Sequence, residues 1–193
     1  MALSIFDLRR GARVDLALSS PPALKWRAGP GARERAVAEA FARTAGFLGL
    51  SPRRCDTGSV DLQVGGEDPG PGRAWLSVGQ ETGDGLADPL ALDFLRFKTH
   101  YREALRVDSA ALGAARAERE RLVSASRGLA DVSLAASSRA VAGYLYRFRE
   151  ALNRDFASPE ALACVWDALR PGALSPGSRA ALLRETFPVI GLP

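Results

Sequence analysis

The sequence predicts a mixed fold, in which a small α/β part over residues 1–87 precedes an all-α antiparallel helical bundle over residues 88–193. Three short segments before Asp88 alternate apolar and polar residues, as half-buried strands do. After Asp88, every periodic segment has helical spacing. With 193 residues and 47% hydrophobic content, the chain is long enough to bury a core in one domain or in two small ones.

The first part is expected to contain strands over residues 14–18, 60–64 and 74–78. One helix is expected over residues 32–48, where apolar side chains recur at helical spacing. Glycine and proline are concentrated in residues 65–72 and 79–85, which are therefore expected to be loops. The resulting order is strand, helix, strand, strand.

The second part is expected to contain five helices. Asp88 followed by Pro89 is a helix cap with a first-turn proline, and Ser158 before Pro159 repeats the pattern. The expected helices cover residues 89–105, 109–129, 131–153 or 133–153, 158–170 and 178–187. Phe94, Leu95 and Trp166 are expected in the core of the bundle.

The formal net charge of +4 leaves two interpretations open. Arginine provides most of the positive charge and suits phosphate recognition through its planar fork, which favours an RNA-binding surface. However, the arginines of residues 32–48 and 109–129 are interleaved with glutamates, which is typical of solvated helix faces.

The chain contains no apolar run near the roughly 20 residues that a membrane span requires, and its start lacks the pattern of a secretory signal. Cys55 and Cys164 are far apart and have no metal-site spacing, so two reduced thiols are expected rather than one disulfide. These features predict a cytoplasmic protein.

Residues 16–50 read LALSSPPALKWRAGPGARERAVAEAFARTAGFLGL. This stretch resembles the opening of the cysteinyl-tRNA synthetase family, in which a Cys-Gly-Pro-Thr turn leads to a His-Ile-Gly-His signature and a helix beginning Ala-Arg. The positions that keep this register without a gap are Pro21, Trp26, Ala32, Arg33 and Gly49. The metal-binding cysteine of the family falls on Ser19, and its nucleotide-binding signature falls on residues 28–31.

Further segments resemble the same family in the same order. Residues 60–68, VDLQVGGED, are similar to its Asp-Ile-His-Gly-Gly-Gly-x-Asp turn, and residues 75–79, WLSVG, to its Trp-Met-His-Val-Gly strand. The two histidine positions are occupied by Gln63 and Ser77. Residues 88–108 and 152–170 resemble the helical stem and the helical domain. The resemblance implies a trimmed remnant of a nucleotide fold on a helical stem and bundle.

The resemblance also shows what this chain lacks. The family's inserted domain would lie between residues 50 and 55, and only QETGDGLA, residues 80–87, stands where the family carries its mobile Lys-Met-Ser-Lys-Ser loop. We therefore expect no catalytic residue, no bound metal and no cofactor. His100, the only histidine, is expected to be a structural residue of the first bundle helix.

A residual ligand site is expected at the mouth of the small sheet, where the strand ending near residues 18–20 meets the helix that starts after Gly31. Carboxyl ends of strands face a crevice in open α/β sheets, and helix amides there favour anions. The expected site residues are Ser19, Trp26, Gly29, Gly31 and Arg33. The expected ligand is a weakly bound anion or an amino-acid-like molecule.

The sequence thus predicts an internally deleted, degenerate paralogue of the family, acting as a binding or regulatory module for tRNA or a protein partner. Two alternatives remain open. One is a divergent enzyme of ligase or aminoacyl-transfer type with a cysteine-like or aminoacyl substrate. The other is a structural subunit of a homo-oligomer or of a synthetase complex.

Overall fold

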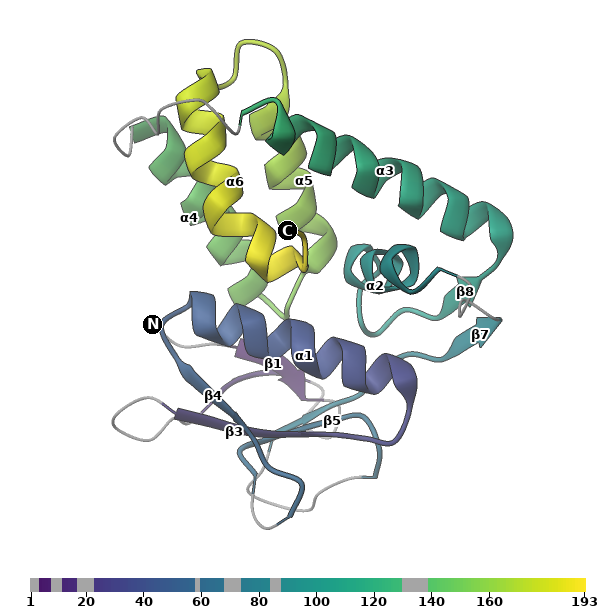
Figure 1. Ribbon diagram of the computed structural model, residues 1–193. Helices are drawn as coiled ribbons and strands as arrows, with labels where there is room; N and C mark the ends of the chain where they lie inside the picture. The colour runs from purple at the N-terminus through teal and green to yellow at the C-terminus, as the bar shows by residue number, and fades with distance from the viewer. Residues whose placement is uncertain are drawn as a thin grey trace.

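The computed structural model describes residues 4–7, 12–16, 23–57, 60–67, 74–83, 88–129 and 139–193. Figure 1 shows a small sheet with one long helix across it and the other helices above. This arrangement confirms the predicted fold class, a small α/β part with a helical part. No helix in the described ranges is both long and apolar enough to span a membrane.

Four parallel strands form the main sheet. In chain order they are β3 (Ala23–Ala28), β4 (Ser51–Arg54), β5 (Leu62–Val64) and β6 (Ala74–Leu76), and their spatial order is β4-β3-β5-β6. Helix α1 (Ala32–Phe47) follows β3 and covers one face of the sheet (Figure 1). The predicted helix and the last two predicted strands are thus confirmed. Each predicted range is one or two residues longer than the observed element.

The strand that leads into α1 differs from the predicted one. It is β3, in which buried Leu24 and Trp26 alternate with Lys25 and Arg27. Of the predicted strand 14–18, the first two residues belong to β2 (Ala12–Asp15), which pairs antiparallel with β1 (Ser4–Asp7), and residues 17–22 lie outside the described ranges. Alternation identifies a strand but not its partner: β2 pairs with β1 in a separate sheet, while β3 belongs to the main sheet and directly precedes α1.

The first bundle helix is shorter than predicted. Helix α2 (Pro89–Lys98) ends where Thr99 turns extended, and residues 105–107 form β8 (Leu105–Val107), paired in parallel with β7 (Glu81–Gly83). Gly83 makes this pairing possible, because a Cβ at this position would lie 1.9 Å from the carbonyl oxygen of Val107. Every segment after Asp88 was expected to be helical, so β8 corrects that expectation.

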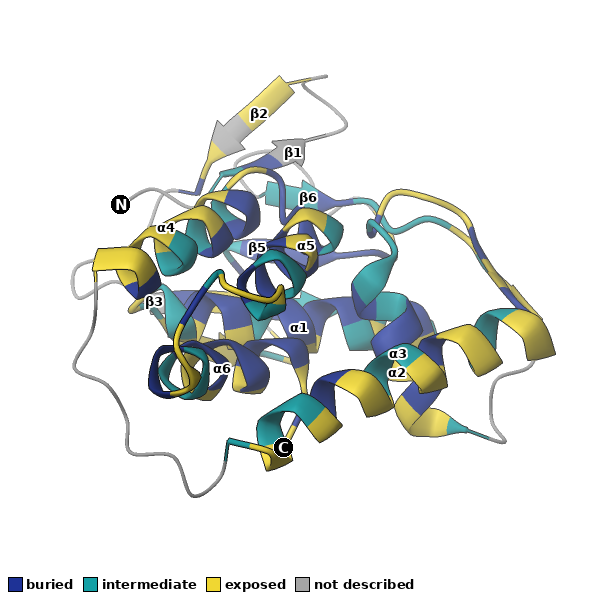
Figure 2. Ribbon diagram, turned by 90° about the horizontal axis from the view of Figure 1, so that it is seen from above, coloured by how far each residue is buried: buried dark blue, intermediate teal, exposed yellow. Residues whose placement is uncertain are grey.

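The remaining helices are α3 (Ser109–Arg127), α4 (Arg139–Asn153), α5 (Ser158–Leu169) and α6 (Pro176–Ile190). Asp108 caps α3, since its side chain accepts from the N–H of Ala111. Helix α3 carries exposed residues along much of its length (Figure 2). The start of the third predicted helix, before residue 139, lies outside the described ranges.

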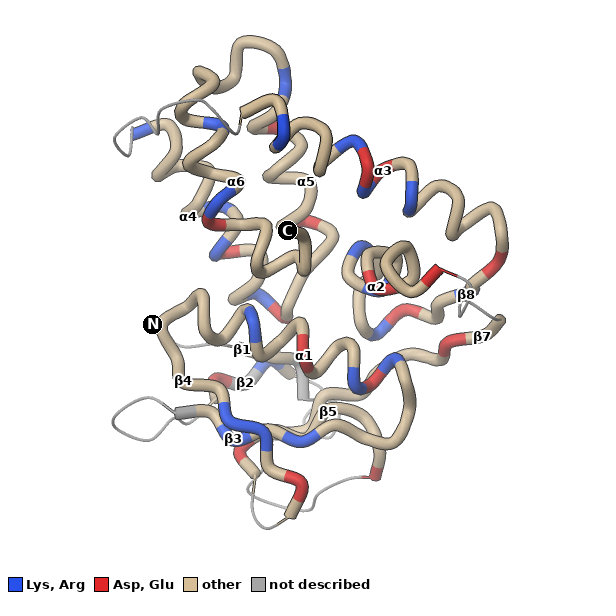
Figure 3. Tube along the Cα trace, in the orientation of Figure 1, with Lys and Arg blue, Asp and Glu red and all other residues tan. Residues whose placement is uncertain are grey.

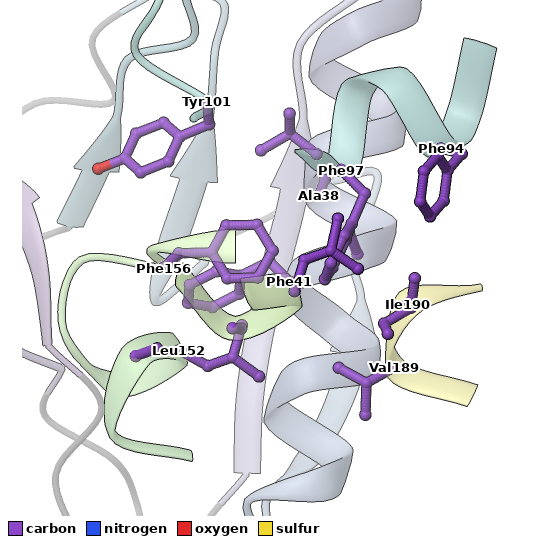
Figure 4. Packing of buried hydrophobic residues seen from close by; sticks show 14 of the residues in the cluster. Ala38, Phe41, Phe94, Phe97, Tyr101, Leu152, Phe156, Val189 and Ile190 are labelled. Atoms are coloured by element: carbon purple, nitrogen blue, oxygen red, sulfur yellow. The ribbon is translucent and has the colours of Figure 1, made fainter. Parts of the chain in front are cut away.

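The hydrophobic core runs through both halves of the chain. One cluster contains Phe41 of α1 together with Phe97 of α2, and the ring of Phe156 lies against both, with centroids 5.6 Å and 6.4 Å away (Figure 4). Phe94 and Leu95 are buried as predicted. Trp166 is only half-buried, because it lies at the edge of this cluster.

The proposed division of the chain at residues 87 and 88 stays a prediction, although the core is continuous across it.

Both cysteines are free thiols: Cys55 is half-buried and Cys164 is buried.

Candidate functional site

The predicted anion site at the start of α1 is bridged by a carboxylate of the chain itself. The N–H of Gly31 donates to Oε2 of Glu34 at 2.7 Å, and the N–H of Gly66 donates to Oε1 of the same residue at 2.7 Å. Glu34 thus joins the helix start to the loop after β5, in the manner of half a capping box. A free anion at these two amides would compete with Glu34.

Gly29 allows the helix start to approach that loop. Its N–H donates to the carbonyl of Val64 at 2.8 Å, and a Cβ at this position would lie 2.6 Å from the backbone nitrogen of Gly66. Any larger residue would push the two loops apart. Gly29 and Gly31 therefore lie together at the predicted place, around the Glu34 carboxylate.

Arg33 points into the protein. Its side chain is 4% exposed, and Nη1 donates to the carbonyls of Gly79 at 2.9 Å and Gln80 at 2.8 Å, while Nη2 donates to that of His100 at 3.3 Å. Burial lowers the pKa of Arg33 below its usual range, and the nearby Glu81 carboxylate opposes this shift. The guanidinium holds the segment after β6 against the turn after α2.

Trp26 lies in the core beneath α1 and is 6% exposed. Its carbonyl accepts from the N–H of Cys55 at 2.9 Å, and the Arg54 guanidinium lies 6.0 Å from the centre of its ring. The structure thus assembles Gly29 and Gly31 but directs Arg33 and Trp26 elsewhere, while Ser19 lies outside the described residues. A ligand-binding role for these five residues stays a prediction.

Gln63, at one of the two histidine positions of the resembled family, is bonded within the sheet. Its Oε1 accepts from Nε of Arg27 at 2.9 Å, and its Nε2 donates to the carbonyl of Gly65 at 3.1 Å. Both ends of the amide therefore have protein partners, and Gln63 fixes the strand end and the side chain of Arg27.

A group of basic side chains that the sequence reading missed lies on two neighbouring strands. We call it the basic strip; it consists of Lys25, Arg27, Arg53 and Arg54. Lys25 is in register with Arg53 across the β3–β4 pair, and β4 is exposed along its whole length. Figure 3 shows blue Lys and Arg positions on both of these neighbouring strands.

Acidic groups balance the basic strip only in part. Asp56 accepts from Nε of Arg54 at 3.0 Å, and Asp61 accepts from the backbone N–H of Lys25 at 2.7 Å. The sequence signal was the Arg53–Arg54 pair on a strand-length segment. The sequence could not show that this pair lies beside Lys25, because residues 25 and 53 are distant in sequence and come together only when β3 pairs with β4.

Asp155 organises a polar cluster beneath the bundle. It is 2% exposed and accepts from the hydroxyl of Tyr101 and, at 2.7 Å, from Nη2 of Arg102. His100 stacks on Tyr101 with Nε2 3.9 Å from Oδ2 of Asp155, and its Nδ1 accepts from the N–H of Arg102. His100 follows the end of α2 rather than lying within it, and its contacts connect this turn to the start of α5.

Asp155 and Phe156 both have positive φ angles, 62° and 48°, a rare conformation for residues other than glycine. The contacts of Asp155 and the packing of Phe156 fix this turn. In the described ranges, this cluster included, no three His, Cys, Asp or Glu side chains come close enough to hold a metal ion.

The chain is similar in sequence to several cysteine–tRNA ligases. It is 39% identical over 80 residues to the cysteine–tRNA ligase of Chlorobium chlorochromatii, and this match covers 42% of this chain and 17% of the relative. It is 41% identical over 102 residues to that of Halorhodospira halophila, covering 49% and 21%. It is 35% identical over 112 residues to the ligase of Methylococcus capsulatus, and this match covers 54% of this chain and 24% of the relative.

These similarities relate the chain to the cysteine–tRNA ligases, as the sequence resemblance predicts. The chain spans about a fifth of the length of these relatives. No protein-family model matches it.

Proposed function

We propose that this relative of the cysteine–tRNA ligases is a non-enzymatic, cytoplasmic binding module that contacts tRNA through the basic strip. The observation that carries the proposal is the placement of Lys25 beside Arg53 on neighbouring strands, with Arg27 on the same face of β3. Arg54 is in register with Trp26 and therefore lies on the other face of the exposed strand β4. Adjacent strands lie roughly 4.8 Å apart, so Lys25, Arg27 and Arg53 form a compact surface for phosphates. Arginine adds directional bonds to phosphate oxygens.

The geometry at the start of α1 supports a role without ATP chemistry. Catalysis at a phosphate requires preorganised positive charge where negative charge develops. Here the carboxylate of Glu34 lies at the two amides, and the guanidinium of Arg33 is bonded to three carbonyls. Neither charge is placed to stabilise a phosphate at the helix start.

Titration of bulk tRNA with the labelled chain at 50 mM and 200 mM salt tests the proposal. If three phosphates are contacted, binding should weaken by roughly 20- to 40-fold over this range, because each contact adds about 0.7 to 0.9 to the log–log slope. The double variant Arg53→Glu/Arg54→Glu should bind more weakly and with a shallower slope.

The control is Arg127→Glu/Arg184→Glu, which makes the same charge change on exposed positions of α3 and α6. Its tRNA affinity should stay closer to that of the unmodified chain. Salt-independent binding, no binding, or a larger loss in the control than in the β4 variant would refute the proposal. Circular dichroism of each variant confirms that it is folded.

A further inference from the structure

A cavity of about 120 Å³ lies where α1, α2 and the end of α6 meet, away from the basic strip. Its floor is apolar, and each floor residue is at most 5% exposed: Val37, Ala40, Phe94, Phe97, Phe156 and Ile190. Figure 4 shows Phe94 of α2 opposite Ile190 of α6, with Phe97 beside them. These side chains come from four distant segments of the chain.

The rim of the cavity is exposed and mostly charged. Glu39 and Arg43 line it from α1, and Leu90 and Asp93 line it from α2. Leu90 is 57% exposed, one of two large apolar side chains exposed to this degree in the described residues. An apolar floor with a few polar groups at its opening is the usual composition of a small-molecule site.

The rim carries three guanidinium groups, one of which is bonded to carboxylates. Arg96 is bonded to Glu81 at 2.7 Å and 2.8 Å and to Asp93 at 3.2 Å, so this group carries one carboxylate more than its single guanidinium balances. Arg43 donates through Nε to the carbonyl of Val189 at 3.1 Å, and its Nη2 lies beside Gly191.

Arg119 of α3 also lines the cavity. Neither Arg43 nor Arg119 forms an ion pair with a described residue. With Glu39, Glu81 and Asp93 set against Arg43, Arg96 and Arg119, the opening carries no net charge, and what it offers an anion is the N–H donors of Arg43 and Arg119.

We propose that this cavity binds a small carboxylate with a compact apolar tail, about the size of an aromatic ring or a branched alkyl group. A dry cavity of about 150 Å³ lined by similar side chains is large enough for benzene, so this floor suits a group of nearly that size. The carboxylate would lie at the rim, where the Nη atoms of Arg43 and the guanidinium of Arg119 donate.

Phenylacetate is a suitable probe, with 2-phenylethanol and 2-phenylethylamine as neutral and cationic counterparts of similar shape. Binding is measured by calorimetry and by methyl NMR shifts of Val37 and Ile190. Phenylacetate should bind about tenfold more tightly than 2-phenylethylamine, because charge-assisted hydrogen bonds at the rim favour the anion.

Two variants separate the floor from the rim. Ala40→Leu fills the floor and should abolish binding of phenylacetate and 2-phenylethanol. Arg43→Gln should weaken phenylacetate about tenfold and leave 2-phenylethanol unchanged, because only the carboxylate uses the guanidinium. Arg127→Gln, an exposed arginine on α3 outside the lining, is the matched control and should have no effect.

The proposal is overturned if no phenylacetate-induced shift occurs at Val37 or Ile190, or if the amine binds as tightly as the acid. Equal phenylacetate affinity in Arg43→Gln and in the unmodified chain would also overturn it. Because the methyl shifts are measured on the unmodified chain, the result holds even if Ala40→Leu does not fold.

Discussion

Arg33 and Glu34 are neighbours on the first turn of α1, and folding commits both charges to the protein itself. The buried guanidinium donates hydrogen bonds to three carbonyls. The carboxylate accepts from one N–H at the helix start and from one in the loop after β5. A charged residue at a helix start is therefore weak evidence for a ligand. The burial of the side chain decides whether its charge is available.

Replacing Arg33 with alanine should destabilise the fold by about 3 kcal/mol, because a buried guanidinium and its bonds to the carbonyls of Gly79 and Gln80 would be lost. The free energy of unfolding from urea titration is the measurement. Arg184→Ala, an exposed arginine of α6, should change it by about 0.5 kcal/mol or less. A similar small effect in both variants would contradict the assigned role of Arg33.

The two thiols should differ in reactivity. Burial raises the pKa of the Cys164 thiol above its usual value, and the charge of Arg147 only partly opposes this shift. Since the thiolate is the reactive form, Cys164 has less of it near neutral pH and is also shielded. Iodoacetamide at pH 8 should therefore modify Cys55 first, as measured by peptide mass spectrometry. Faster labelling of Cys164 in the folded chain would count against its burial.

At the scale of single elements, the segment after α2 shows how local pattern and pairing compete. Apolar residues recur at helical spacing from Leu90 onward, which is why the helix was expected to reach residue 105, and Leu105 and Val107 are apolar as well. Instead both are buried from β8, and Arg106 between them is exposed. The partner strand β7 comes from the first half of the chain, and it determines this conformation.

The Asp88 cap of α2 should make the stability of the folded protein depend on pH in the acidic range. The N–H of Ala91 and then Arg116 lower the pKa of Asp88 below its ordinary value of about 3.9. A lowered pKa in the folded state means that the carboxylate stabilises the fold above about pH 4, and that this contribution is lost as pH falls through the folded value. Asp88→Asn should therefore be less stable than the unmodified chain at pH 7.

Urea midpoints measured between pH 3 and pH 7 test this dependence. The gap between Asp88→Asn and the unmodified chain should narrow below about pH 4. Glu185→Gln, an exposed carboxylate on α6, is the control and should follow the unmodified chain. A gap that is constant over the whole range would argue against the lowered pKa of Asp88.

At the scale of the whole molecule, the two halves of the sequence share one core. Phe156 packs against Phe41 of α1 and Phe97 of α2, and Arg43 of α1 is bonded to the carbonyl of Val189 in α6. The N-terminal strand also reaches the bundle, where the hydroxyl of Ser4 donates to the carbonyl of Asn153 at 2.7 Å.

This shared core predicts a single cooperative unfolding transition. Hydrogen exchange in increasing urea, followed by mass spectrometry, should give the same opening free energy for core amides of α1 and of α5, because neither buries its apolar face alone. Two separate opening free energies would instead support independent domains divided near residue 87.

The sequence alone determined the features that depend on local chemistry and on relationship. It predicted α1 to within one residue at its end, the cap and proline that start α2, the burial of Phe94 and Leu95, and the similarity to the cysteine–tRNA ligases. Helical periodicity and capping act within a few residues, so they can be read along the chain.

Only the tertiary structure decided which strand enters α1, where the charges of Arg33 and Glu34 go, and that Lys25 lies beside Arg53. It also assembled the cavity floor from α1, α2, α6 and the turn before α5. Each of these features depends on contact between residues far apart in sequence. Local patterns carry no information on such pairing, because it is determined by the packing of the shared core.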